Sequence, residues 1–321
     1  MTSIKILPAH NTFQQWGSQS LLDGALKAGI AVAYGCSNGN CGACKAKLLQ
    51  GHIERIRYHD YVLPEAEKGA GYFLMCAHKA KSDLVIEAEQ ACGADDIPMQ
   101  QVKTRVKKFT ALDERVNLLR VQTPRTQTLR FLAGQKVVVT LPDDSRATLA
   151  IASCPCDERN IEFHIPLNGS PFAQHPLPAL KMNDTILLEG PLGDFTLESF
   201  CEKPSLFIAE ETGFAAIKSL IEHAFSLEMS CPLELHLMHR SDKHYLHNLA
   251  RSWQDAMDNV VYRTYPGNAM ENCLGLFNDI LKRYPALSGI HIYLAGTDSI
   301  TRCFMDQVHS EGLPDDPVKI F

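Results

Sequence analysis

The pattern of hydrophobic positions divides the chain into three parts. Residues 1 to about 90 contain short strand-like stretches and one amphipathic helix expected at residues 21–29, with Ser20 as its N-cap. From residue 102 to about 197, short strand-like segments follow one another and are separated by turn signals. After Lys203, strand-like and helix-like segments alternate. We therefore predict a small β-rich unit, a small β-barrel and a doubly wound parallel α/β sheet, in that order.

The expected elements also suggest domain boundaries. The polar segment 92–99 is the expected linker after the first unit, so we predict domains at residues 1–92, 101–199 and 203–321 in a multidomain α+β and α/β protein. The six expected barrel strands are residues 104–110, 116–123, 136–141, 147–152, 160–165 and 184–189. In the last part, the expected strands are 205–209, 233–238, 260–265 and 291–295, and the expected helices are 214–226, 247–257, 274–283 and 299–311.

Composition and charge narrow the classes of function. Of the 321 residues, 45% are hydrophobic and 21% are charged, as in an ordinary globular protein. The formal net charge of -6 argues against nucleic-acid binding, which requires clustered Lys and Arg. The sequence shows neither a basic and then apolar leader nor an apolar run approaching the ~20 residues of a membrane span. We therefore expect a cytoplasmic protein whose thiols are kept reduced.

The eleven cysteines are unevenly distributed, because Cys36, Cys41 and Cys44 lie close together. With Cys76 they show the spacing Cys-x4-Cys-x2-Cys followed by a distant Cys, which is the plant-type spacing of [2Fe–2S] proteins. The small residues between the first three allow the backbone to wrap closely and to point N–H groups at the sulfurs. A zinc ribbon would require two Cys-x2-Cys pairs, and one is present. We therefore predict that these four cysteines bind a [2Fe–2S] cluster.

The first 90 residues resemble the ferredoxin family, with a helix, a loop containing Tyr34-Gly35-Cys36 and a strand ending at Cys76 in the family's order. The whole chain resembles the ferredoxin–NAD(P)H reductase family in the order of its parts, in Gly134-Gln135, in segment 190–195 and in the terminal Phe321. The resemblance implies a β-grasp ferredoxin domain, a six-stranded FAD-binding β-barrel and an NAD(P)-binding domain. It also implies that hydride passes from NAD(P)H to FAD, and that single electrons pass to the cluster and then to a partner such as an oxygenase component.

The flavin motif of that family, Arg-x-Tyr-Ser-x-x-Ser, is changed in this chain. When its last serine is aligned with Ser153, Leu149 and Ala150 occupy the Tyr and Ser positions. Arg146 then lies one residue before the Arg position, and it points away from the flavin unless a bulge corrects the shift. A second family hydroxyl maps to Ala173. The resemblance thus assigns the flavin contacts to positions that have lost most of their hydrogen-bonding groups.

The nicotinamide motifs are changed as well. The family's Gly-Gly-Thr-Gly reads Glu210-Glu211-Thr212-Gly213 here, and its Cys-Gly-Pro-Pro reads Ala295-Gly296-Thr297-Asp298. Glycines let a pyrophosphate approach the helix N-terminus, whereas two carboxylates obstruct and repel it unless they point to solvent. By resemblance, the cofactor contacts that remain in this part are Thr212, Gly213, Gly296 and Phe321, of which Phe321 either stacks on the flavin or is buried at a domain interface.

Two hypotheses about function therefore stay open. The first is an oxidoreductase that passes electrons from NAD(P)H through FAD and the [2Fe–2S] cluster to an oxygenase-like partner. The second is a non-enzymatic [2Fe–2S] electron relay or accessory subunit whose reductase body has lost FAD and NAD(P)H binding. The domain order and the complete cluster motif support the first hypothesis, and the changed nucleotide motifs support the second.

Two further groups of residues each have alternative interpretations. Cys154-Pro155-Cys156 is either a redox or metal pair or, as we expect, a turn at the end of a strand, and the seven cysteines outside the cluster motif are expected to be reduced thiols. His239, His244 and His247 lie close together in sequence, and the i, i+3 spacing of His244 and His247 allows a metal pair. No acidic third ligand is nearby in sequence, so we expect exposed or capping histidines.

We predict that the purified protein is brown, because a [2Fe–2S] cluster absorbs visible light. Cys41→Ser should abolish this colour, since it removes one of the four thiolate ligands. Visible absorption spectra and iron analysis of the wild type and the variant provide the measurement. A colourless wild-type protein with full zinc occupancy would contradict the cluster assignment.

Overall fold

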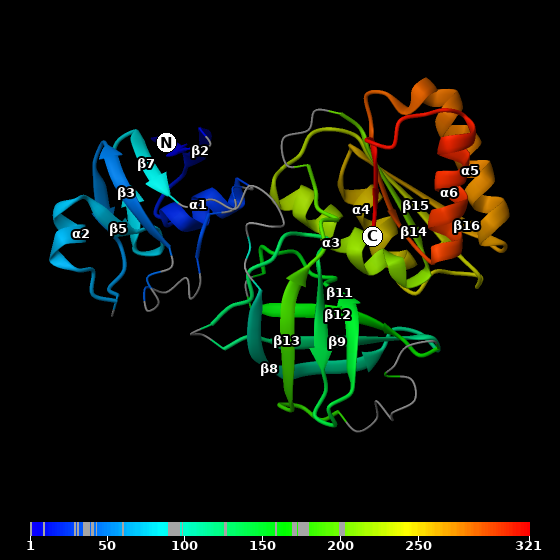
Figure 1. The fold of residues 1–321 in the computed structure, drawn as a ribbon, viewed down its shortest axis with the longest axis horizontal. Coiled ribbons are helices and arrows are strands. Elements are labelled where there is room, and N and C mark those ends of the chain that lie inside the picture. The colour runs from blue at the N-terminus through cyan, green and yellow to red at the C-terminus, as the bar shows by residue number, and fades with distance from the viewer. Residues whose placement is uncertain are drawn as a thin grey trace.

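The computed structural model describes all residues except 1, 9, 29, 31, 35–38, 40, 41, 43, 60, 89–96, 98, 125, 126, 158, 169–171, 173–179 and 199–202. The described elements form three larger sheets and one two-stranded sheet, and the larger sheets follow one another along the chain (Figure 1). Among the helices in this part of the chain, none is long and apolar enough to cross a membrane.

The first sheet is a five-stranded β-grasp sheet crossed by one helix. Helix α1 (Leu21–Lys27) begins after Ser20, whose hydroxyl accepts a hydrogen bond from Asp23 N, so the predicted N-cap is confirmed. Leu21 and Leu22 of this helix are fully buried in the same core as Ile4. The strands are β1 (Thr2–Leu7), β2 (Asn11–Gln15), β3 (Lys45–Gln50), β5 (Tyr72–Leu74) and β7 (Leu84–Ala88), in the order β2-β1-β7-β3-β5.

Short elements complete the first part of the chain. Strands β4 (Ile53–Arg55) and β6 (His78–Ala80) pair as the two-stranded sheet. Helix α2 (Glu65–Gly69) precedes β5, and the 3-10 turn η1 (Met75–Ala77) follows it directly. This turn therefore lies at the end of the sheet where the chain leaves β5.

The second sheet is a near-closed barrel of six antiparallel strands, as predicted, in the order β11-β10-β13-β8-β9-β12. Its two edges approach each other where Ala152 N donates to Glu162 O at 2.8 Å. Alternate residues of each strand, such as Val137 and Val139, fill the interior. The strands are β8 (Gln100–Ala111), β9 (Val116–Gln122), β10 (Lys136–Thr140), β11 (Arg146–Ala150), β12 (Asn160–Pro166) and β13 (Thr185–Leu192).

The third sheet is parallel and doubly wound, in the order β16-β15-β14-β17-β18. Chain order reverses next to β14, so ligands are expected at the carboxyl ends of β14 and β17. Helices α3 and α4 cover one face of the sheet, and α5 and α6 cover the other. The strands are β14 (Ser205–Glu210), β15 (Leu233–His239), β16 (Val260–Pro266), β17 (His291–Ala295) and β18 (Val318–Ile320); the helices are α3 (Phe214–Ser226), α4 (His247–Ala256), α5 (Ala269–Arg283) and α6 (Asp298–Ser310).

Two elements of the third sheet differ from the prediction. Helix α5 begins at Ala269 rather than at residue 274, because the Asn268 side chain caps it by accepting from Met270 N. Strand β18 was not predicted, since three residues that include Lys319 show no clear alternation. It pairs with β17 and brings the last residue of the chain to the sheet.

The first sheet lies to one side of the molecule, whereas the barrel lies against the helix α3 side of the third sheet (Figure 1). The predicted domains 1–92, 101–199 and 203–321 stay predictions. The described strands lie within these ranges with one exception. Strand β8 begins at Gln100, one residue before the predicted start of the second domain.

Gly134 lies where the barrel meets α3, and we predict that Gly134→Ala destabilises the protein. Its φ is 88°, and a Cβ there would lie 2.2 Å from Phe195 O and 2.9 Å from a methyl carbon of Leu220. Holding a non-glycine residue in the left-handed backbone region costs about 1–3 kcal/mol, and a steric clash of the new Cβ with its neighbours costs about 1–3 kcal/mol more. We therefore expect the free energy of unfolding to fall by about 2–6 kcal/mol, measured by urea denaturation.

Gly275→Ala is the matched control. Gly275 lies exposed inside α5, and a Cβ there would meet nothing within 4 Å. The same substitution should therefore raise the free energy of unfolding by about 0.5–1 kcal/mol, because alanine is the better helix former. Equal effects of the two substitutions would contradict the steric argument.

Candidate functional site

The pairing of β3 with β5 brings two of the predicted cluster cysteines together. Lys45 lies opposite Leu74, so Cys44, which precedes β3, lies beside Cys76 in the turn after β5. Their sulfur atoms are 3.1 Å apart, although 32 residues separate them in the sequence. Both side chains are buried. The sheet register therefore creates a two-thiol site that the local sequence cannot form by itself.

This pair has the chemistry of a metal site. The hydrogen bond with Cys76 lowers the pKa of Cys44 to about 7, against the opposing effect of burial. The thiolate is the form of cysteine that binds a metal. Two buried, adjacent sulfurs fit a cysteine-bound iron–sulfur cluster. The other two predicted ligands, Cys36 and Cys41, lie outside the described residues.

Two glycines shape the described part of the loop before Cys44. Gly39 and Gly42 have φ values of 91° and 75°. A Cβ on Gly39 would lie 2.3 Å from His59 Cβ, and one on Gly42 would lie 2.5 Å from the Tyr61 ring. The segment that carries His59 and Tyr61 therefore covers the loop closely. The sequence analysis did not identify this role, because these two residues belong to no motif.

The residues aligned with the flavin motif do not share one face of the barrel. Over the described strands β10 and β11 the pairing has no register shift, so no bulge corrects the position of Arg146. Arg146 is exposed and forms an ion pair with Glu189 of β13. Leu149 points into the barrel core, whereas Ala150 packs against the core of the third sheet. The side chains therefore do not converge as a flavin-binding motif would require.

Ser153 belongs to the contact between the barrel and α3. Its hydroxyl accepts a hydrogen bond from Glu162 N at 3.2 Å, and its carbonyl accepts one from Ser219 Oγ at 2.7 Å. The side chain of Ser153 is buried. The hydroxyl that the alignment assigned to the flavin therefore already has a partner within the chain.

Lys218 is a residue that the sequence analysis missed. Its ammonium is nearly buried, donates to Ala152 O at 3.0 Å and forms ion pairs with Glu162 at 3.3 Å and Glu222 at 2.7 Å. Burial acts to raise the pKa of Glu162, but Lys218 and Arg120 lower it on balance. The only signal in the sequence is a lysine within the apolar run of α3, where a lysine would ordinarily be expected to reach solvent.

Glu210 fills the crevice at the carboxyl ends of β14 and β17. Glu210 is 3% exposed, and its carboxylate accepts hydrogen bonds from Thr297 N at 2.9 Å and from Thr297 Oγ1 at 2.6 Å. Thr297 is the N-cap of α6, where an anion is favoured by the helix dipole. The two turns approach closely, since a Cβ on Gly213 would lie 2.3 Å from Ala295 O and one on Gly296 would lie 3.0 Å from Glu210 Cβ.

Glu211 also points at a partner within the chain. It begins the 3-10 turn η5 (Glu211–Gly213), in which Thr212 is half-buried. Its carboxylate accepts from Arg240 N at 2.8 Å and forms an ion pair with Arg115 of the barrel at 3.4 Å. Neither glutamate therefore has the solvent-directed orientation that the sequence left open. The carboxylates hold the N–H groups of Thr297 and Arg240 in this arrangement, so a dinucleotide pyrophosphate could reach these groups only after both carboxylates moved away.

Phe321 occupies the interface between the barrel and the third sheet. Its N–H donates to Leu294 O at 3.0 Å, which extends the edge formed by β18. Its ring meets Phe195 edge to face at 5.5 Å, and the Lys136 ammonium lies 5.2 Å from the ring centroid. The ring is half-buried in this position, and its predicted contact with the flavin stays a prediction.

His239, the last residue of β15, and His244 are buried, which corrects the expectation that they are exposed, and both of them and His247 have partners within the fold. His239 contacts Ser241 O at 2.7 Å, His244 contacts Glu211 O at 3.1 Å, and His247 contacts the Tyr262 hydroxyl at 2.9 Å. Burial lowers the pKa of His244 to about 4, so its ring is neutral at pH 7. The described residues contain no group of three or more His, Cys, Asp or Glu side chains that could hold a metal ion.

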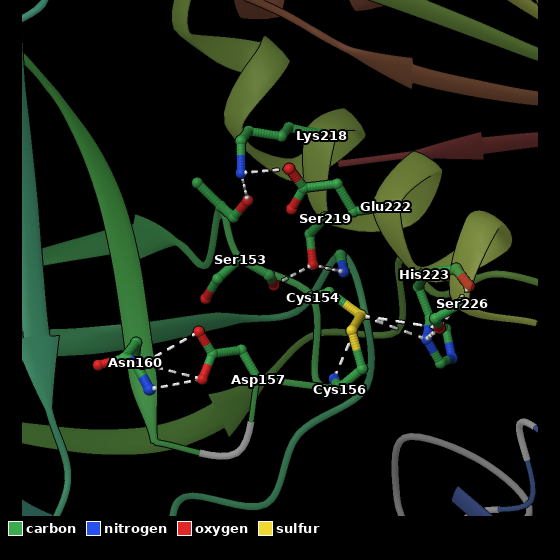
Figure 2. Close-up of a disulfide and its surroundings, with 12 residues drawn as sticks. Ser153, Cys154, Cys156, Asp157, Asn160, Lys218, Ser219, Glu222, His223 and Ser226 are labelled. Atoms are coloured by element: carbon green, nitrogen blue, oxygen red, sulfur yellow. Dashed lines mark hydrogen bonds and ion pairs between the residues drawn. A yellow bond between two sulfur atoms is a disulfide. The ribbon is translucent and has the colours of Figure 1, made fainter. Parts of the chain in front are cut away.

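Cys154 and Cys156 are joined by a disulfide (Figure 2), which corrects the expectation that both are reduced thiols. The turn through Pro155 brings their Cα atoms to 5.1 Å, within the range of disulfide-bonded pairs. Spacing in the sequence could not reveal this geometry, because it depends on the turn. Cys231, Cys273 and Cys303 are buried and form no disulfide, in agreement with the expectation of reduced thiols.

The first part of the chain matches a known protein family, and the full chain is similar to known reductases. Residues 4–81 match the family of 2Fe-2S iron-sulfur cluster binding domains. The chain is 25% identical over 317 residues to a CDP-6-deoxy-L-threo-D-glycero-4-hexulose-3-dehydrase reductase of Yersinia pestis, covering 97% of this chain and 95% of the relative. It is 28% identical over 289 residues to the ferredoxin–NAD(P)(+) reductase component of the naphthalene 1,2-dioxygenase/salicylate 5-hydroxylase systems of a Ralstonia species, covering 88% and 86%.

Solved structures with the same fold extend over the whole chain. An Amycolatopsis cytochrome P450 reductase aligns with a TM-score of 0.59 at 17% identity and covers 100% of this chain and 98% of its own. A ferredoxin reductase of carbazole 1,9a-dioxygenase aligns with a TM-score of 0.55 at 20% identity and covers 99% and 97%. The predicted succession of ferredoxin domain, flavin-type barrel and parallel sheet is therefore confirmed as the fold.

We predict that removing the two carboxylates, with Glu210→Gly and Glu211→Gly, tightens the binding of NADH or NADPH to the intact protein about a hundredfold. Arg115 offsets the charge of Glu211, so we count one net repulsive charge. A unit charge ~6 Å away at an effective dielectric of ~20 opposes a phosphate by ~3 kcal/mol, which is about a hundredfold in affinity. Titration calorimetry measures the affinities. Glu311→Gln removes a charge from an exposed position after α6 and should leave the affinity unchanged. An unaltered affinity in the double variant would contradict the repulsion argument.

Proposed function

We propose that the chain is a member of the ferredoxin–NAD(P)H reductase family and the electron-transfer component of a cytoplasmic oxygenase-type or dehydratase-type system, because residues 4–81 match the 2Fe-2S cluster binding domains and the full chain is similar to reductase components of such systems. It passes electrons through the cluster to an oxygenase-like redox partner. The observation that carries this proposal is the pair of buried sulfurs of Cys44 and Cys76, 3.1 Å apart within the matched domain.

Four cysteines bind the cluster in this proposal. Cys44 and Cys76 supply two ligands from the start of β3 and from the turn after β5, which lie at the same end of this strand pair, and Cys36 and Cys41 supply the other two. When bound, the cluster accepts and releases one electron at a time. The protein positions it, excludes water from the sulfurs of Cys44 and Cys76 and keeps them close together.

A surface beside the cluster loop suits the docking of a redox partner. Tyr58 and Val62 are 81% and 77% exposed, and they flank the segment of His59 and Tyr61 that covers the loop. Exposed apolar side chains that gather into a patch mark protein-interaction sites, so we propose that these two residues contribute to one. A partner that binds there would lie close to the cluster.

The reductase hypothesis is favoured over a relay without reductase activity. The similarity to reductase components covers the barrel and the parallel sheet as well as the ferredoxin domain. In this proposal FAD binds at the barrel, chiefly through backbone groups, because the motif side chains do not converge there. NAD(P)H binding requires Glu210 and Glu211 to leave the N–H groups of Thr297 and Arg240.

Anaerobic reduction tests the proposal. NADH or NADPH is added to the purified full-length protein while the visible absorption of the cluster is followed, and bound flavin is released and quantified. We expect bound FAD and bleaching by at least one nucleotide, with slow bleaching at low nucleotide concentration. The Glu210→Gly, Glu211→Gly variant should bleach faster, because its crevice no longer repels the pyrophosphate.

Matched cysteine variants control this experiment. Cys76→Ser should lack the cluster absorption, whereas Cys231→Ser, which removes a buried thiol outside the cluster motif and before β15, should keep it. A protein without flavin, whose cluster dithionite reduces but neither nucleotide does, would overturn the reductase proposal in favour of the relay.

A further inference from the structure

The disulfide lies at one end of a continuous contact between the barrel and α3, which Figure 2 shows in detail. Ala152 O accepts from Lys218 Nζ, Ser153 O accepts from Ser219 Oγ, and the Cys154 backbone hydrogen-bonds to the Glu222 carboxylate. We call this contact the α3 seam; it consists of residues 152–154 and the α3 side chains of Lys218, Ser219, Glu222, His223 and Ser226. The seam holds the segment that leads into the disulfide in one position.

The two bonded sulfurs have different surroundings. The residue Cys154 is 5% exposed, and its sulfur lies 3.8 Å from His223 Nδ1 and 3.8 Å from Ser226 Oγ. Cys156 is exposed, and its N–H donates to the Cys154 sulfur at 3.2 Å. A thiol in solution can therefore reach the sulfur of Cys156, whereas the helix shields that of Cys154.

This bond is poorly suited to holding the fold together. It joins residues two positions apart, and the constraint that a disulfide places on the unfolded chain grows with the length of the loop it closes. The seam also has polar contacts from Lys218, Ser219 and Glu222 that do not depend on the bond. Disulfides in reducing compartments are usually transient and redox-active. A role in thiol–disulfide chemistry therefore explains the Cys154–Cys156 bond better than a role in stabilising the fold.

We propose that Cys154 and Cys156 form a thiol–disulfide exchange site for low-molecular-weight thiols of the glutathione class. In the reductive direction, a thiolate bonds to the Cys156 sulfur while the Cys154–Cys156 bond breaks, and Cys154 leaves as a thiolate that takes a proton from solvent. A second thiolate then displaces Cys156 from the mixed disulfide. One protein disulfide and two thiols thus give two protein thiols and one small-molecule disulfide, so the protein gains two electrons and the small thiols lose them.

Peptide mapping tests the exchange directly. Trypsin releases both cysteines in one peptide, residues 147–159, which contains no other cysteine. The native full-length protein is equilibrated anaerobically with mixtures of reduced and oxidised glutathione, quenched with acid and alkylated after denaturation. We expect mass spectrometry to show a reversible change from unalkylated to doubly alkylated peptide as the mixture becomes more reducing. A peptide that is doubly alkylated at every ratio, or at none, would overturn the proposal.

Two single variants test which sulfur is attacked. In Cys154→Ser, the exposed Cys156 should form a mixed disulfide with oxidised glutathione at least tenfold faster than the buried Cys154 does in Cys156→Ser. Cys231→Ser, the matched control, should leave the exchange unchanged. Equal rates in the first two variants, or a faster reaction of Cys154, would refute the role of Cys156. The readout is alkylation of a single peptide, so it is independent of electron transfer through the cluster.

Discussion

A buried ammonium joins the barrel to the parallel sheet. Lys218 of α3 is removed from water, and a buried charge of this kind is strongly unfavourable unless it is paired. Its partners come from both sides, because Ala152 O and Glu162 belong to the barrel and Glu222 belongs to α3 itself. Removing one partner of a buried pair typically costs about 3–5 kcal/mol. The relative position of these two parts therefore depends on this contact.

Helix α3 links several features that are far apart in the sequence. The turn before it carries Glu211 and Gly213, its middle carries Lys218, and its last turns face the Cys154–Cys156 disulfide. The helix is a single rigid element, so the crevice of the parallel sheet and the strand end of the barrel are held by the same support. This explains how the barrel contacts both the turn before α3, through Arg115, and the middle of the helix, through Ser153.

The chain's own carboxylates occupy the place where a doubly wound sheet attracts an anion. The dipole of α6 and the free N–H groups of the turn favour negative charge at this point, whatever its source. The carboxylate of Glu210 accepts a hydrogen bond from Thr297 N there. The carboxylate of Glu211 accepts one from Arg240 N and also forms an ion pair with Arg115. The same physics that binds a pyrophosphate in a dinucleotide site therefore stabilises the closed crevice in this protein.

The sequence by itself determined the fold class and the cluster motif, because both depend on local periodicity and spacing. Strand alternation and helical periodicity predicted the barrel and the parallel sheet, and the cysteine spacing predicted the [2Fe–2S] domain. Only the tertiary structure decided which groups meet across the fold. The register of β3 and β5 brings the sulfurs of Cys44 and Cys76 together. Lys218 becomes buried because the barrel packs on α3. Glu210 and Glu211 point inward because their carboxylates accept hydrogen bonds from backbone N–H groups. Each of these contacts joins residues distant in sequence, and a local pattern contains no information about such partners.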